Sequence, residues 1–159
     1  MTTETLTNNK KSTTSETLES NKKIVRQTFE VFEKNDMKIL DTLYDQGNVK
    51  LHFPGTTGLM SYDDYKKMNT DYIKAFPDSK VNVDLQIAEG EYVCTYVTFS
   101  GTHKGEFQGF PASNKKVKLT TTTIDRIVNG KIVEEWTEFD QMSLLQQIGA
   151  VPEMNTAKR

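Results

Sequence analysis

Residues 117–139 read VKLTTTTIDRIVNGKIVEEWTEF, and this stretch decides how the rest of the chain is interpreted. Two runs rich in β-branched residues, Val117–Val128 and Lys131–Phe139, flank the pair Asn129-Gly130. Asn-Gly between such runs is the strongest short-range hairpin signal, because a two-residue turn of this kind needs positive φ at both central positions. The sequence therefore predicts a long antiparallel hairpin near the C-terminus.

A second hairpin is expected just before the first. Val81, Val83, Leu85 and Ile87 alternate with polar residues, and a turn at Glu89-Gly90 leads into 92–103, which is rich in β-branched and aromatic residues. Residues 104–116 contain glycine, proline and asparagine and are expected to form a loop. A short strand over 49–53 is predicted earlier in the chain.

Helices are expected on both sides of that short strand. Apolar residues at helical spacing predict helices over 21–34, 36–45 and 62–76, and Asp140 is in position to cap a last helix. Helices gathered early and hairpins gathered late favour an α+β fold, with a curved antiparallel sheet wrapped around the N-terminal helices. No glycine fingerprint lies between a strand and a helix, which excludes a Rossmann dinucleotide fold.

The length of 159 residues suits one domain. Residues 1–20 are mostly Thr, Ser, Asn, Lys and Glu, so they cannot bury enough apolar surface to offset the entropy of ordering them. We therefore expect a disordered tail over 1–20, a folded domain over 21–152 and a C-terminal tail over 153–159.

The composition also limits the partners. A net charge of −2 gives no field that would drive binding to a nucleic-acid backbone, and no run of about 18 apolar residues suits a membrane span. One cysteine, Cys94, and two histidines cannot build a disulfide or a common zinc site. We expect a cytoplasmic protein with no metal, no nucleic-acid partner and no membrane association.

Several ordered segments together resemble the SnoaL-like polyketide cyclase or ester cyclase family. They are Asn35-Asp36, Ala75–Asp78, Gly101–Phe107, Gly109–Pro111, Arg126–Trp136, Asp140 and Leu144–Gly149. The resemblance covers about residues 21–152 in register. Each segment is weak alone, but their order along the chain is specific.

The resemblance implies a nuclear-transport-factor-2-like fold, a cone whose open end forms a deep apolar pocket. It also implies cofactor-free chemistry in which members of the family close a ring in a polyketide ester by an intramolecular aldol step. Such a reaction needs a base that removes a proton from carbon, an apolar cavity that holds the enolate, and an acid that protonates the new alkoxide. We expect a small hydrophobic carbonyl compound as the ligand and no cofactor.

In the family pattern, a histidine precedes the Asn-Gly turn and an aspartate follows the tryptophan; here Thr123 and Thr137 occupy these places. A threonine hydroxyl does not titrate near neutral pH. The remaining catalytic candidates are His52, whose strand position could direct it into the pocket mouth, and Asp140, which could instead be a helix cap.

Further residues are expected around the pocket. An aromatic stripe on the helix over 62–76 would line a half-open cone or, alternatively, fill the core. The predicted ligand-binding residues are Phe29, His52, Tyr72, Phe76, Thr123, Trp136 and Thr137. Glu135 and Glu138 lie on opposite faces of one strand, so at most one points inward; an inward carboxylate would have a raised pKa and could act as a base, whereas an outward one would be solvated.

Three functions stay open on these residues. The first is an enzyme that cyclises or isomerises a carbonyl compound, and the second is a non-catalytic module that binds a small ligand in the same cavity. The third is a dimeric scaffold. Because both faces of 92–99 carry apolar residues, we also expect a homodimer formed through that sheet.

Overall fold

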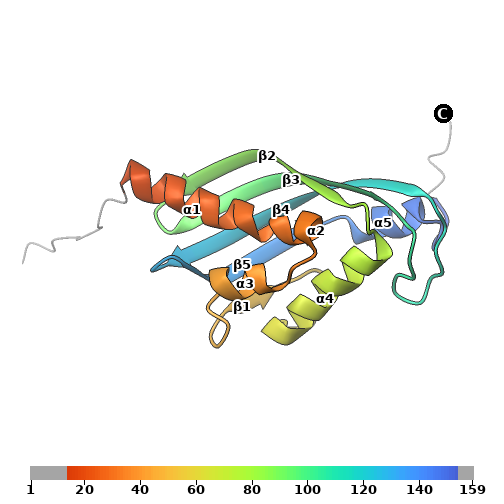
Figure 1. Ribbon diagram of the computed structural model, residues 1–159, viewed down its shortest axis with the longest axis horizontal. Coiled ribbons are helices and arrows are strands. Elements are labelled where there is room, and N and C mark those ends of the chain that lie inside the picture. The colour runs from red at the N-terminus through yellow and green to blue at the C-terminus, as the bar shows by residue number, and fades with distance from the viewer. Residues whose placement is uncertain (1–13, 154–159) are drawn as a thin grey trace, which may run out of the picture.

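The computed structural model describes residues 14–153, which form the expected α+β fold (Figure 1). Five strands form one sheet in the order β1-β5-β4-β3-β2, with β1 parallel to β5 and all other neighbours antiparallel. The strands are β1 (Lys50–His52), β2 (Lys80–Glu89), β3 (Tyr92–Thr102), β4 (Lys116–Val128) and β5 (Lys131–Phe139). The predicted fold class is confirmed.

The helices lie mainly on one face of this sheet (Figure 1). They are α1 (Ser15–Thr28), α2 (Glu30–Lys34), α3 (Lys38–Leu43), α4 (Tyr62–Ala75) and α5 (Gln141–Gln147). We refer to the sheet face that these helices cover as the inner face and to the other as the outer face. On the inner face, α1 packs against β2 and β3 while α3 packs against β5.

The first helix differs from its expected bounds. It begins at Ser15, because the Thr14 side chain accepts a hydrogen bond from the backbone N–H of Thr17 and so caps the first turn. The tail that we expected over 1–20 therefore includes residues that the structure places in α1, and residues 1–13 lie outside the described part. Residues 154–159 of the expected C-terminal tail lie outside it as well.

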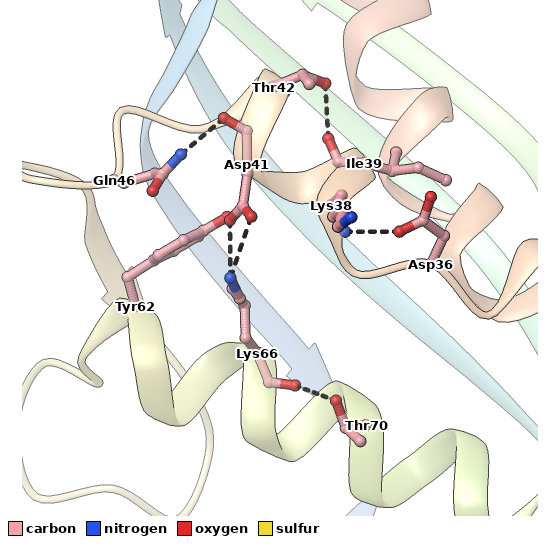
Figure 2. Close-up of polar contacts among 9 residues, drawn as sticks. All are labelled: Asp36, Lys38, Ile39, Asp41, Thr42, Gln46, Tyr62, Lys66 and Thr70. Atoms are coloured by element: carbon pink, nitrogen blue, oxygen red, sulfur yellow. Dashed lines mark hydrogen bonds and ion pairs between the residues drawn. The ribbon is translucent and has the colours of Figure 1, made fainter.

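Helices α3 and α4 are joined by a polar contact that Figure 2 shows in detail. The Asp41 carboxylate accepts hydrogen bonds from Lys66 Nζ at 2.9 and 3.2 Å and from the Tyr62 hydroxyl at 3.0 Å. The hydrogen bond from Lys66 lowers the pKa of Asp41. We call these three residues the α3–α4 clamp. The clamp holds the end of α3 beside the first turns of α4.

Each hairpin contains one β-bulge, an extra residue that changes which side chains face inward. In β2, Val83 pairs with Val97 but Leu85 pairs with Tyr96, so Asp84 is the extra residue. In β5, Ile132 pairs with Ile127 but Glu134 pairs with Arg126, so Val133 is the extra residue. Residues on the two sides of a bulge therefore do not follow a single alternation.

The β2 bulge overturns the expectation that Val81, Val83, Leu85 and Ile87 share one face. Leu85 and Ile87 lie on the outer face, where they are 56% and 60% exposed. Across the sheet, a row on the outer face runs through the register partners Ile87, Cys94, Ile124, Trp136 and His52. We call this set the outer row.

Two groups of buried apolar side chains form the core between the helices and the inner face. One group surrounds Val25, Leu40, Tyr44 and Ile132 beneath α1 and α3. The other surrounds Phe76, Phe99 and Phe107, at the end of the sheet that carries α5. The cavity described below is lined by residues that contact both groups.

Candidate active site

A cavity of about 90 Å³ opens between the helices and the inner face of the sheet. Its walls are mostly aromatic and aliphatic, which suits a ligand with an apolar body. The residues that line it are Phe29, Phe32, Phe53, Tyr65, Met68, Asn69, Tyr72, Val81, Val97, Phe99, Leu119, Thr121, Thr123, Thr137 and Phe139.

Hydroxyl groups and the Asn69 side chain supply the polar part of this wall. Thr123 and Thr137 are register partners on β4 and β5, so their side chains lie next to each other on the inner face. Tyr65 reaches the same cavity from α4. These three side chains connect the cavity to a charged group behind it.

That group is a pair of buried carboxyls, Asp125 and Glu135, which are also register partners. Asp125 is 1% exposed and Glu135 is 4% exposed. The Thr123 hydroxyl donates to Asp125 Oδ2 at 2.9 Å, and the Thr137 hydroxyl donates to Glu135 Oε1 at 2.8 Å. Each cavity threonine is therefore hydrogen-bonded to the carboxyl group two residues away on its own strand.

Two tyrosines complete the network around Glu135. The Tyr44 hydroxyl donates to Glu135 Oε2 at 2.5 Å, and the Tyr65 hydroxyl donates to Glu135 Oε1 at 3.1 Å. Tyr44 follows α3, where the backbone N–H of Asp45 donates to the carbonyl of Ile132. The α3–α4 clamp thus joins the two helical segments that carry these phenols.

The β5 bulge determines which residues meet in this network. Counted from the Asn129-Gly130 turn without a bulge, Thr123 would pair with Trp136. With Val133 as the extra residue, Thr123 pairs with Thr137 and Asp125 pairs with Glu135. β-Bulges are common near active sites because they redirect side chains in this way.

Burial controls the electrostatics of the pair. Burial, and then the neighbouring Glu135 charge, raise the pKa of Asp125 well above its usual value. Burial likewise raises the pKa of Tyr44 and of Tyr65, and Glu135 raises both further. Burial therefore favours the neutral form of both phenols and of the Asp125 carboxyl group.

Four of the expected ligand-binding residues line the cavity: Phe29, Tyr72, Thr123 and Thr137. Phe76 does not line it. Its side chain is fully buried in the neighbouring core, where its ring lies 5.6 Å from that of Phe107 and 5.7 Å from that of Phe99.

His52 and Trp136 lie on the outer face, away from the cavity. Their rings stack with centroids 5.0 Å apart, and His52 Nε2 lies 2.9 Å from Glu134 Oε1. Trp136 alternates with the inward residues Glu135 and Thr137, and His52 is its partner on β1. Neither residue is placed to touch a ligand in the cavity.

Asp140 caps α5, as the alternative reading of the sequence had it. Its Oδ1 accepts a hydrogen bond from the backbone N–H of Ser143 at 2.8 Å, and the residue is exposed outside the cavity. His103 is fully buried, and its Nδ1 accepts a hydrogen bond from the backbone N–H of Ser113 at 3.1 Å. This contact ties together the two ends of the loop over 103–113.

Sequence reasoning missed Asp125 and Tyr44 and left the direction of Glu135 open. Asp125 could have been found, because it alternates with Thr123 and Ile127 on a strand whose inner face was recognised. Tyr44 offered no such signal, since its contact with Glu135 depends on how α3 packs against β5. Among residues 14–153, no group of three or more His, Cys, Asp or Glu side chains is arranged to hold a metal ion.

Comparisons with known proteins agree with the fold. The family model described as SnoaL-like polyketide cyclase matches residues 22–148. No curated protein matches the chain. Within the described residues, no helix is long and apolar enough to cross a membrane.

Solved structures include similar chains of low sequence identity. AclR of Streptomyces galilaeus, a candidate hydroxylase, superposes with a TM-score of 0.77 at 24% identity, over 87% of each chain. IdmH of Streptomyces antibioticus, a candidate polyketide cyclase, has a TM-score of 0.72 at 26% identity, over 81% of this chain and 98% of its own. A candidate SnoaL-like polyketide cyclase from Jannaschia sp. CCS1 has a TM-score of 0.74 at 19% identity, over 84% of this chain and 94% of its own. The chain therefore belongs to the SnoaL-like polyketide cyclase family and has the nuclear-transport-factor-2-like fold.

Proposed function

We propose that this protein binds a small hydrophobic carbonyl compound in its cavity and catalyses a cofactor-free acid/base cyclisation or isomerisation. One observation carries the proposal: Glu135 accepts hydrogen bonds from Thr137 and Tyr65, and both of these residues line the cavity. An apolar cavity that ends in hydroxyls backed by a carboxylate provides both binding and proton transfer.

The ligand would lie with its apolar body among the aromatic residues and its carbonyl oxygen at the Tyr65 hydroxyl. On ligand binding the single Tyr65 hydroxyl proton would turn from Glu135 to the developing enolate oxygen, which a neutral phenol stabilises in a water-poor site. Thr137 would accept the proton from the ligand carbon as its own hydroxyl proton moves to Glu135. In this arrangement Glu135 is the base, and the threonine at the family position transmits the proton without having to titrate.

The cavity volume limits the size of the group that enters. An apolar cavity of about 150 Å³ holds benzene. At about 90 Å³, this cavity accepts a short alkyl or a compact carbonyl end unless its side chains move. We therefore propose a compact substrate, or the compact reactive end of a larger one.

The direct experiment measures deuterium exchange into carbonyl compounds in D₂O by proton NMR, with a panel that runs from acetoacetate esters to cyclohexanone. We expect exchange above the buffer rate for at least one compound. Glu135→Gln should reduce that enzymatic rate by about 10²–10⁴-fold, the usual contribution of a positioned base.

The matched control is Glu138→Gln on the same strand, where the side chain is exposed on the outer face. The control should keep the wild-type rate. Equal losses in the two variants would contradict the role of Glu135, and so would exchange that persists in Glu135→Gln.

A non-catalytic binding module is the second candidate, favoured by uncharged hydroxyls at both family acid/base positions, Thr123 and Thr137. It predicts that a panel compound binds without any exchange. Isothermal titration calorimetry with the same panel separates the two functions, because binding with no rate above buffer supports the module and contradicts catalysis.

We also propose a homodimer through the outer face. Its support is the outer row, together with the exposed side chains of Leu85 and Tyr96 beside it. An apolar surface of this kind on a soluble domain commonly marks a protein contact. Size-exclusion chromatography with light scattering at micromolar concentration tests the proposal, and a monomer would reject it.

A further inference from the structure

The two carboxyl groups behind the cavity are not equivalent. Glu135 accepts hydrogen bonds from three hydroxyls, those of Tyr44, Tyr65 and Thr137. Asp125 accepts one, from Thr123. Hydrogen bonds donated to a carboxylate stabilise its ionised form, so the network favours the negative charge on Glu135 rather than on Asp125.

Within residues 14–153, no cation lies in place to balance a second charge on the pair. Among the described residues, no lysine, arginine or histidine forms an ion pair with either carboxyl group. The groups that face the pair are the phenols of Tyr44 after α3 and Tyr65 on α4, and the hydroxyls of Thr123 on β4 and Thr137 on β5. Two adjacent buried carboxylates without a cation would repel each other, so one of the two carries a proton.

We propose that Asp125 is a positioning residue that shares a single proton with Glu135, so that the pair takes a second proton from the ligand and later returns it. This inference rests on the proposed function, in which Glu135 is the base. Asp125 does not touch the cavity. It acts through Glu135, to which it is the directly opposite partner on β4.

The proton balance of a cyclisation closes within this pair. In the first step the ligand C–H bond breaks, Thr137 receives that proton, and the Thr137 hydroxyl proton passes to Glu135; the pair then holds two protons and the ligand is an enolate. The enolate carbon next forms a bond to the acceptor carbonyl carbon, whose oxygen becomes an alkoxide. That alkoxide takes a proton back through Thr137, and the pair returns to one proton with no other reactant consumed.

The shared proton gives the pH dependence of the exchange rate a definite direction. The pair must hold only one proton to accept another from the ligand, so activity is lost at acid pH, where both carboxyl groups are protonated. Ionisation of Asp125 at alkaline pH would add a second buried charge and change the rate again. Asp125→Asn keeps a donor toward Glu135 but removes this second ionisation.

Carbon-13 NMR of the side-chain carboxyls tests the inference without any substrate. In the wild-type chain we expect the Cγ of Asp125 to show a protonated carboxyl at pH 7 while the Cδ of Glu135 shows an ionised one. In Glu135→Gln, the midpoint of Asp125 ionisation should fall by more than about 1 pH unit, because the neighbouring charge is gone. Glu138→Gln should leave both signals unchanged.

Two results would overturn the inference: an ionised Asp125 at pH 7 in the wild-type chain, or an Asp125 midpoint that Glu135→Gln does not move. The wild-type titration decides the question even if a variant fails to fold. Failure of the proposed function would look different. The carboxyl groups would titrate as expected, but no panel compound would exchange deuterium. Where exchange occurs, its pH profile in Asp125→Asn should lose the alkaline change and keep the acid one.

Discussion

The two hairpins of the sheet each carry one β-bulge. One bulge turns apolar side chains to the outer face, and the other is next to a carboxyl group that points inward. In the β2–β3 hairpin, the extra residue Asp84 turns Leu85 and Ile87 outward and leaves them exposed. In the β4–β5 hairpin, the extra residue Val133 accompanies the inward position of Glu135 and the outward position of Trp136. One bulge therefore puts apolar side chains on the surface, and the other puts a carboxyl group in the interior.

This difference separates two kinds of surface on one sheet. The inner face near β5 contains buried polar groups, and the stability of the fold there depends on all of their hydrogen bonds being formed. The outer face near β2 instead carries the exposed apolar side chains of Leu85 and Ile87. Substitutions at matched positions on the two faces should therefore differ in size, and the following four experiments order them by expected effect.

The largest difference is expected for removal of a carboxyl group. Glu135→Leu leaves three buried hydroxyls without their acceptor and should destabilise the fold by about 3–5 kcal/mol. Glu138→Leu, on the outer face of the same strand, should change stability by less than about 0.5 kcal/mol. Urea unfolding monitored by circular dichroism measures both, and similar losses would mean that the two faces do not differ as described.

A smaller effect is expected for removal of a phenol hydroxyl. Tyr44→Phe removes a hydrogen bond to a buried charge and should cost about 1.5–3 kcal/mol. Tyr96→Phe on the outer face is the control, since that tyrosine is 41% exposed and should lose less than about 0.5 kcal/mol. The same unfolding assay applies, and a Tyr44→Phe variant as stable as the wild type would remove Tyr44 from the network.

Asp125→Asn should have an effect that depends on pH. Because the folded-state pKa of Asp125 is raised, the unfolded chain ionises at lower pH than the folded one, and wild-type stability falls as pH rises above the unfolded value of about 3.9. The variant lacks this loss, so its free energy of unfolding relative to wild type should improve steadily from pH 4 to pH 8.

Urea unfolding at several pH values measures this trend, and Thr120→Ala at an exposed position on β4 serves as its control. The control removes no ionisable group, so its stability difference should hardly vary with pH. A flat response in Asp125→Asn would show that Asp125 is ionised in the folded protein.

The smallest effect on stability is expected for Ile87→Lys in the outer row. Ile87 is 60% exposed, so the free energy of unfolding of the isolated chain should change by less than about 0.5 kcal/mol. The proposed homodimer should nevertheless dissociate, because the substitution places a charge in its apolar contact. Light scattering measures the molar mass of the variant in solution. Lys80→Ala at the start of β2 is the control, and it should remain a dimer.

Much of this architecture could be predicted from local patterns. Asn129-Gly130 predicted the turn that the structure contains, with φ of 50° and 74° at the two residues. Helical spacing predicted α4, and Ser61 caps it by accepting a hydrogen bond from the backbone N–H of Asp64. Turns and helix caps are determined by residues that are close in sequence, so they can be predicted without knowing the tertiary packing.

The site could be predicted only in part, because bulges depend on contacts across the sheet. Thr123 and Thr137 were placed on the cavity wall by the family pattern, and both line it. The inward alternation of Leu85 and Ile87 was wrong, since no residue near Asp84 signals an extra position. The contact of Tyr44 with Glu135 joins residues that are 91 positions apart in the sequence, so no local pattern predicts it.

The α3–α4 clamp has a consequence for how this protein could diversify. It joins Asp41 to Tyr62 and Lys66 directly, so the spacing of the two phenol-bearing segments does not depend on the exposed connection over 55–59, between β1 and α4. That connection could be lengthened, shortened or replaced by a grafted peptide while the buried network keeps its geometry. Evolution and protein engineering alike could then vary this surface segment while the buried hydrogen-bond network around Glu135 stays the same.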